Sequence, residues 1–208
     1  MSIVLYQTFL NTFLLSSMIC FYVDILAPHY RVNVISQSAI LHDYYNMVPR
    51  VASNIIIAYP YFYVSEKYFI LAHKANAYSF ITNIILWIVV TDIFFYSIHR
   101  LFHTKYLYHY HAIHHTYRYT YGMGAIYAHW LEFYLANLFP LSIPMILFKI
   151  PFDMCNTIVM MATFFTVVIS HGGFNIPFSG GHLYHHLKYK YNFGLFKMDN
   201  LMKTKILC

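Results

Sequence analysis

Long stretches with few or no charged side chains alternate with short polar segments along this chain. The apolar stretches cover residues 3–26, 48–71, 75–91, 133–148 and 154–170. A helix needs about 20 apolar residues to cross a bilayer. The stretch 48–71 is interrupted by Pro60 and by Glu66-Lys67, so it is the weakest candidate. The pattern predicts an all-α integral membrane protein with about four to five membrane helices or hairpin arms.

The polar segments between these stretches indicate how the helices are connected. Residues 31–45 are expected to form a surface segment, and residues 149–153 a polar turn that makes 133–170 a helical hairpin. Pro140 and Pro144 are expected to kink the first arm, because proline removes a helical hydrogen bond. Asp92 follows the stretch 75–91 and marks one membrane boundary.

The composition supports a membrane protein. The 208 residues are 60% hydrophobic and only 10% charged, whereas soluble domains are about 25% charged. The length and the lack of a linker favour a single domain over residues 1–208. The net charge of +6 is not gathered in a stripe beside a recognition fold, so no nucleic-acid partner is expected.

The basic residues are placed asymmetrically. If the helices alternate across the bilayer, ten of the thirteen lie on one side and three on the other. The ten are Arg31, Arg50, Arg100, Lys105, Arg118, Lys188, Lys190, Lys197, Lys203 and Lys205. Lysine and arginine are enriched in cytoplasmic loops. This side is therefore predicted to face the cytosol.

Histidines cluster on the same side. Three boxes and one further residue supply nine of them: His99 and His103; His111, His114 and His115; His182, His185 and His186; and His171. Residues three or four apart share one face of a helix, and imidazole is the commonest side-chain ligand of transition metals. Nine ligands are too many for one ion. The boxes therefore predict two metal ions in a cytosol-facing helical cap.

Four other residues are candidates for this site. His129 could ligate a metal or hydrogen-bond Glu132 one turn on. Asp92 shares a helix face with His99 and could orient its imidazole as a hydrogen-bond acceptor, although a plain helix-end carboxylate is an equal alternative. Glu132 and Asp199 are candidates for the same orienting role.

Several classes of metal protein fit the sequence poorly. Structural zinc sites usually include cysteines, and none lies near a box. Carboxylate-bridged di-iron proteins need several glutamates, but the chain has only Glu66 and Glu132. A transporter would carry ionisable residues within its spans, and the spans predicted here are nearly free of them. A non-catalytic or degenerate membrane metal-binding protein remains the alternative to an enzyme.

The ordered boxes His-x-x-x-His, His-x-x-His-His and His-x-x-His-His resemble the fatty acid hydroxylase and sterol desaturase superfamily of membrane di-iron oxygenases. The resemblance covers residues 91–204 and includes Ala128-His-Trp-Leu-Glu132, His171-Gly-Gly-Phe-Asn-Ile-Pro177 and Asn192-Phe-Gly194. The spacing from Met123 to Glu132 is closer to the C-4 methylsterol oxidase branch.

The resemblance implies a lipid hydroxylase or desaturase with two Fe ions and O2 as co-substrate. It also implies electrons from NAD(P)H through cytochrome b5 and its reductase. The substrate would be a sterol, such as a C-4 methylsterol, or a fatty acyl chain. The endoplasmic reticulum is the expected location if the chain is eukaryotic.

Overall fold

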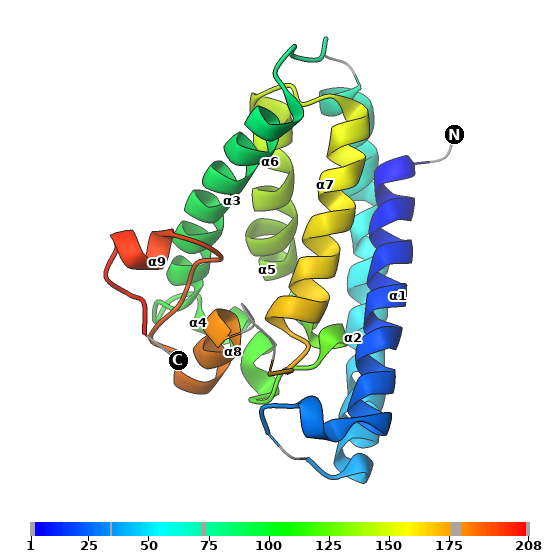
Figure 1. The fold of residues 1–208 in the computed structure, drawn as a ribbon, viewed down its shortest axis with the longest axis vertical. Helices are drawn as coiled ribbons and strands as arrows, with labels where there is room; N and C mark the ends of the chain where they lie inside the picture. Colours follow the sequence, from blue (N-terminus) through cyan, green and yellow to red (C-terminus); the bar gives the residue numbers. More distant parts are fainter. Residues whose placement is uncertain (1–2, 34, 72–73, 176–179, 207–208) are drawn as a thin grey trace.

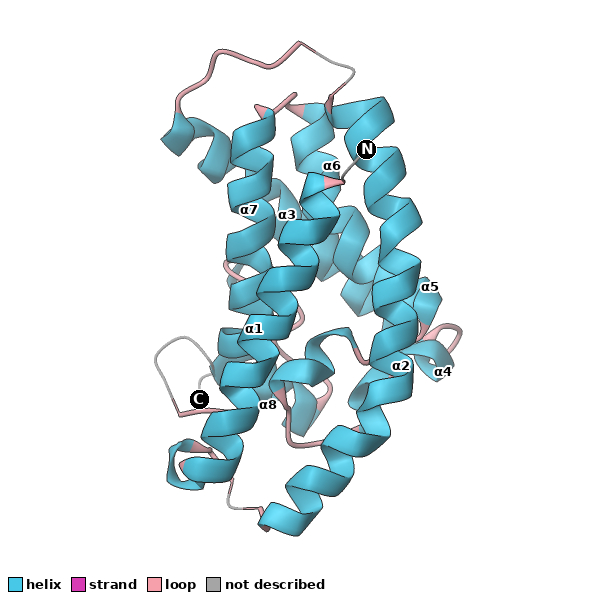
Figure 2. Cartoon of the chain, turned by 90° about the vertical axis from the view of Figure 1, so that its right-hand side faces the viewer, coloured by secondary structure: helices cyan, strands magenta, loops and turns pink. Residues whose placement is uncertain are grey.

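Helices make up nearly all of the regular structure (Figure 2). The computed structural model describes residues 3–33, 35–71, 74–175 and 180–206. Within these ranges there is no β-strand, and one isolated antiparallel bridge joins Arg31 to Phe174. The predicted all-α fold is confirmed.

Four helices are long and apolar enough to cross a membrane. They are α1 (Val4–Leu26), α3 (Phe80–Phe102), the continuous helix Trp130–Leu147 and the continuous helix Phe152–Ser170. The third comprises α5 (Trp130–Glu132), the π-helical η5 (Phe133–Leu138) and α6 (Phe139–Leu147). The fourth comprises α7 (Phe152–Phe164) and the π-helical η6 (Phe165–Ser170). The hairpin predicted for residues 133–170 is therefore present.

The stretch after α1 differs from the prediction. Most described residues of 31–45 lie at the surface, as predicted, but α2 (Gln37–Val64) already begins within this segment and continues as the π-helical η2 (Ser65–Ile70). The Ser36 hydroxyl accepts a hydrogen bond from the Ala39 N–H and caps the helix. Every third or fourth residue from Ile40 to Phe62 is buried, which explains why the polar start is helical.

A proline in α6 leaves one carbonyl group without its helical N–H donor, and a side chain of α3 donates to it. Pro144 has no N–H to donate to the Pro140 carbonyl, and the Thr91 hydroxyl of α3 donates to that carbonyl instead, at 3.1 Å. The Trp87 indole donates to the Leu141 carbonyl at 3.0 Å. These two bonds fix α3 against α6.

The spans pack into one bundle with a helical cap at one end (Figure 1). Helix α1 contacts α7 and α2, while α3 contacts α6. The cap contains α4 (Tyr108–His111), η3 (His114–Thr116), η4 (Gly122–Ile126), α8 (Gly180–Lys188) and α9 (Met198–Leu201). The lower end of α3 lies beside this cap, so the first histidine box reaches the other boxes (Figure 1).

Candidate metal centre

Nine of the ten candidate histidines converge into two groups. The first contains His99, His103, His111, His115 and His185. The second contains His114, His171, His182 and His186. In each group one nitrogen per ring lies within 4.8 Å of all the others. Eight of these side chains are buried, and His103 is half-buried.

Each of the two His-x-x-His-His boxes contributes to both groups. His111 and His115 join the first group, whereas His114 joins the second. His185 joins the first group, whereas His182 and His186 join the second. Helix α8 carries the third box as expected. The prediction that the second box lies on one regular helix is wrong, because α4 ends at His111 and a 3-10 turn begins at His114.

Hydrogen bonds orient five of the rings through their Nδ1 atoms. His99 donates to the Phe193 carbonyl (2.7 Å) and His185 to the Tyr191 carbonyl (2.7 Å). His171 donates to the Thr166 carbonyl (2.9 Å) and His114 to the Tyr127 carbonyl (3.2 Å). His111 donates to the Glu132 carboxylate (2.6 Å).

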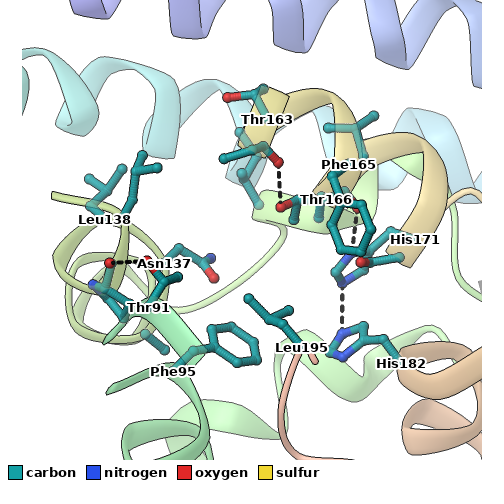
Figure 3. Close-up of a pocket in the computed structure, with 18 of the residues that line it drawn as sticks. Thr91, Phe95, Asn137, Leu138, Thr163, Phe165, Thr166, His171, His182 and Leu195 are labelled. Atoms are coloured by element: carbon teal, nitrogen blue, oxygen red, sulfur yellow. Dashed lines mark hydrogen bonds between the residues drawn. The ribbon is translucent and has the colours of Figure 1, made fainter. Parts of the chain in front are cut away.

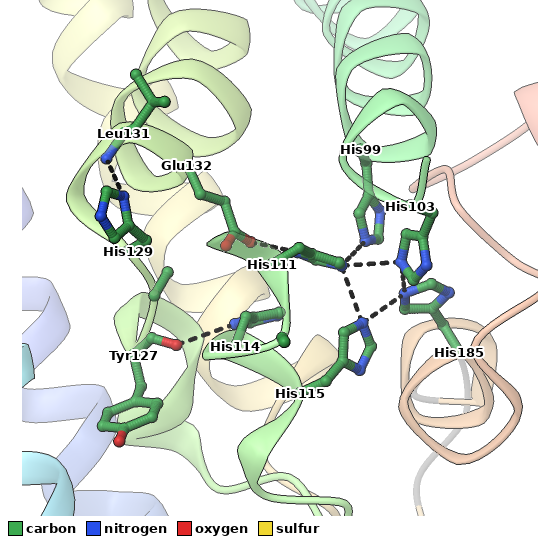
Figure 4. A network of polar contacts seen from close by, with 12 residues as sticks. His99, His103, His111, His114, His115, Tyr127, His129, Leu131, Glu132 and His185 are labelled. Atoms are coloured by element: carbon green, nitrogen blue, oxygen red, sulfur yellow. Dashed lines mark hydrogen bonds and ion pairs between the residues drawn. The ribbon is translucent and has the colours of Figure 1, made fainter. Parts of the chain in front are cut away.

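This protonation pattern leaves bare Nε2 lone pairs facing each other. A neutral imidazole has one N–H, so a ring that donates through Nδ1 has no proton on Nε2. The Nε2 atom of His111 nevertheless lies 3.2 Å from that of His99, and those of His171 and His114 are 3.3 Å apart. Figure 4 shows the first group turned toward a common centre. Facing lone pairs repel unless a cation lies between them.

The spacing of the nitrogens suits a transition-metal ion. Two nitrogens that each lie about 2.1 Å from one ion, at right angles, are about 3.0 Å apart. The Nε2 atom of His111 lies 2.8 Å from His103 Nε2 and 2.9 Å from His115 Nε2. Both ring nitrogens of buried His186 lack a hydrogen-bond partner. The residues therefore fit a bound metal in each group.

Burial keeps these imidazoles neutral. It lowers the pKa of His103 to about 3, of His114 to about 4 and of His171 to about 3. Burial, with smaller contributions from neighbouring imidazoles, also lowers the pKa values of His182 and His186. A metal ligand must be a neutral imidazole. At neutral pH a metal ion can therefore bind without displacing a proton from an imidazolium ring.

The three carboxylates expected to orient an imidazole, Asp92, Glu132 and Asp199, have different partners. Glu132 accepts a hydrogen bond from His111, as described above. Among the described residues, Asp92 makes no hydrogen bond to an imidazole: its two oxygens accept the main-chain N–H groups of Leu195, Phe196, Lys197 and Met198 at 2.7 to 3.1 Å.

Asp199 also acts on the main chain. It accepts the N–H groups of Phe193 (2.8 Å) and Gly194 (2.7 Å). Asp92 and Asp199 together hold the loop 192–198, whose Phe193 carbonyl orients His99.

His129 lies outside both groups. Its Nδ1 accepts the Leu131 N–H (3.2 Å) at the start of α5, and it makes no hydrogen bond to Glu132 (Figure 4). The motif end Ile176-Pro177 falls outside the described residues.

Some supporting residues were not anticipated from the sequence. Asn54 of α2 donates to the carbonyls of Ile126 (2.8 Å) and Ala128 (3.0 Å), next to the Tyr127 carbonyl that orients His114. Asn54 could have been noticed as a polar residue inside an apolar stretch. The carbonyl acceptors have no sequence signal, because every residue has one.

A buried ion pair supports the loop after His171. Arg31 pairs with Asp24 and donates to the Thr120 carbonyl at 2.8 Å. The neighbouring Val32 N–H donates to the Gly173 carbonyl at 3.0 Å. The N-terminal part of the chain therefore positions a histidine segment that lies 140 residues further on.

An apolar cavity of about 270 Å³ leads to both histidine groups. It lies between α1, α3, η5 and the α7–η6 helix. Its wall includes Phe9, Trp87, Phe95, Phe133 and Ile158. His99 and His111 of the first group and His114, His171 and His182 of the second also line it. Figure 3 shows His171 and His182 at one side of this space.

Comparison with known proteins identifies the family. The fatty acid hydroxylase family model matches residues 84–204, which is more than half of the chain. The chain belongs to the fatty acid hydroxylase family. The match contains all nine clustered histidines.

Individual relatives are more distant. The chain is 32% identical to a C-4 methylsterol oxidase of Schizosaccharomyces pombe over 128 residues, 54% of this chain and 43% of the relative. It is 31% identical to a fatty acid hydroxylase of Mycosarcoma maydis over 131 residues, 57% of this chain and 33% of the relative. It is 28% identical to fatty acid hydroxylase domain-containing protein 2 of Homo sapiens over 130 residues, 60% of this chain and 39% of the relative.

The matched regions thus span less than half the length of these relatives. No solved structure matches the chain.

Proposed function

We propose that this chain is an O2-dependent membrane oxidoreductase that hydroxylates or desaturates a lipid, with one iron ion in each histidine group. The observation that carries the proposal is the position of the two groups at the wall of an apolar cavity. Family membership and the names of the relatives support lipid oxidation as the reaction class.

The donor sets favour iron over the common alternatives. Magnesium and calcium prefer oxygen ligands, whereas imidazole suits iron, zinc and copper. Structural zinc is satisfied by four ligands, which the five-histidine group exceeds. Two bound iron ions would supply the redox capacity to reduce O2 and to attack an unactivated C–H bond.

The protein's own residues would do the remaining work. The cavity would bind the hydrocarbon part of a lipid and exclude water from the reacting carbon. Glu132 would hold the proton on His111 Nδ1, so that Nε2 stays free for the metal. The carbonyls of Phe193 and Tyr191 would do the same for His99 and His185.

Electrons would come from NAD(P)H through cytochrome b5 and its reductase. The basic residues around the histidine cap, such as Lys188, Lys190 and Lys197, would suit an acidic partner of this kind. The same residues favour a cytosol-facing cap in the endoplasmic reticulum membrane.

The proposal is tested by expressing the chain in a host that lacks its own sterol oxidase or lipid hydroxylase. Mass spectrometry of the lipids should reveal an oxidised product, and the purified chain should hold about two iron ions, one for each histidine group. The variants His114→Ala and His185→Ala should abolish the product. His42→Ala is the matched control, because that histidine is exposed on α2 and belongs to neither group.

The absence of an oxidised lipid in the presence of two iron ions would contradict the proposed activity. Product formation by both His114→Ala and His185→Ala would contradict the assigned site.

A further inference from the structure

Among the described residues that line the cavity, Asn137 supplies the one carboxamide. Asn137 lies on η5 and is half-buried. No hydrogen bond links its side chain to any described residue. Figure 3 shows the carboxamide pointing into the cavity from the wall opposite His171 and His182. An amide in apolar surroundings is unfavourable without a partner. A partner for Asn137 must therefore come from what occupies the cavity.

Two neighbouring threonines show the contrast. Thr91 donates to the Pro140 carbonyl and Thr166 to the Ala162 carbonyl. Both line the cavity, yet both hydroxyls are satisfied by the protein. The Asn137 carboxamide, with two donors and an acceptor, is free to bind a ligand.

The backbone around Asn137 is also unusual. Residues Phe133–Leu138 are π-helical, a conformation that is rare and found frequently at functional sites. Two tyrosines brace this segment against α2: the Tyr61 hydroxyl and the Leu138 carbonyl are 3.0 Å apart, and the Tyr134 hydroxyl and the Ile57 carbonyl are 2.6 Å apart. Asn137 is thus presented from a fixed wall and not from a loop.

The chemistry of the wall restricts the ligand group. Among the described lining residues there is no lysine or arginine, and the single carboxylate, Glu132, is bonded to His111. A charged head group would have no counter-ion here. A carboxamide both donates and accepts hydrogen bonds, as a neutral hydroxyl does.

Resting on the proposed function, we infer that Asn137 selects a lipid that carries a neutral hydroxyl on its hydrocarbon skeleton. The hydroxyl binds Asn137 on one side of the cavity, and the carbon to be oxidised faces the histidine groups on the other. A plain acyl chain has no group to bind Asn137, so the cavity favours a hydroxylated skeleton of the sterol type.

The inference is tested by measuring binding to the purified, iron-loaded chain in detergent. Cholestanol and cholestane differ only in one hydroxyl. The wild-type chain should bind cholestanol about tenfold more tightly in competition against labelled cholestanol, the effect of about one good hydrogen bond. Asn137→Leu, which keeps the side-chain size, should bind both lipids equally. Thr91→Val is the matched cavity control and should keep the preference, because its hydroxyl already bonds to Pro140.

Equal binding of both lipids by the wild-type chain would overturn the inference. It would indicate that the Asn137 carboxamide binds water and not the lipid hydroxyl. A preference that survives in Asn137→Leu would overturn it as well. Neither measurement requires turnover. A chain that oxidises no lipid yet prefers cholestanol would contradict the proposed function and leave the role of Asn137 supported.

Discussion

At the scale of single residues, neighbouring histidines have different tasks. His114 and His115 are adjacent in sequence but belong to different groups, and so do His185 and His186. Adjacent side chains point in different directions, by about 100° on the α-helix of the third box and by about 120° in the 3-10 turn of the second. The doubled histidine at the end of the second and third boxes therefore joins the two groups into one centre.

This division predicts separate losses of metal. His114→Ala should reduce the affinity of the four-histidine group, and His115→Ala that of the five-histidine group, leaving about one tightly bound iron in each variant. Iron analysis after dialysis would show the number, and iron spectroscopy should show different remaining signals. Identical spectra for the two variants would contradict the division.

Glu132 should affect the metal through His111 alone. Replacing a carboxylate that orients a ligand histidine typically costs 10- to 100-fold in metal affinity. We expect a loss of about that size for Glu132→Leu and a smaller one for Glu132→Gln, whose carbonyl can still accept the hydrogen bond from His111 Nδ1. Iron titration of the purified variants would measure both, and an unchanged affinity in Glu132→Leu would exclude the orienting role.

At the scale of elements, the C-terminal loop depends on two carboxylates. The four N–H groups bound by Asp92 and the two bound by Asp199 belong to one segment, and that segment orients His99. Asp92→Ala should therefore destabilise the protein by about 2 kcal/mol, because four partly buried N–H groups lose a charged partner. Thermal unfolding in detergent would measure it. Asp153→Ala, at an exposed position in the first turn of α7, should have a much smaller effect.

Two glycines of η4 offer a matched pair. A Cβ atom on Gly122 would lie 2.7 Å from the Cys20 side chain, whereas one on Gly124 would have no neighbour within 4 Å. Gly122→Ala should thus separate η4 from α1 and cost about 1 to 3 kcal/mol, as overpacking does. Gly124→Ala should be close to neutral. Comparison of their unfolding temperatures tests the packing, and equal temperatures would contradict it.

At the scale of the whole molecule, the metal centre joins segments that are far apart in the chain. The first box ends α3, the second lies in the cap, His171 follows η6, and the third lies on α8. Bound ions would therefore act as cross-links between them.

Removal of the metal should loosen this end of the bundle. A ligand present at about 100 times its Kd stabilises by about 2.7 kcal/mol, so a chelator should lower Tm by about 5 to 10 °C. Ferrous iron should restore Tm, whereas magnesium should not, because it prefers oxygen ligands. An unchanged Tm after verified iron removal would exclude the cross-linking role.

The sequence by itself determined the helical class, four of the spans, the hairpin, and which nine histidines come together. These features depend on local patterns: hydrophobic length, proline and glycine positions, and imidazoles at helical spacing. The start of α2 at Gln37 was not predicted for the same reason, since the polar composition of residues 37–45 does not indicate a helix with one buried face.

Only the tertiary structure decided how the histidines divide into groups of five and four, and what orients them. Main-chain carbonyls, the loop held by Asp92 and Asp199, and the support from Asn54 and Arg31 have no local signature. The contacts of Asp92, Asn54 and Val32, and the bond from His99 to the Phe193 carbonyl, join residues about 70 to 140 positions apart. Such contacts form only when the helices pack, because packing alone brings those groups within hydrogen-bonding distance.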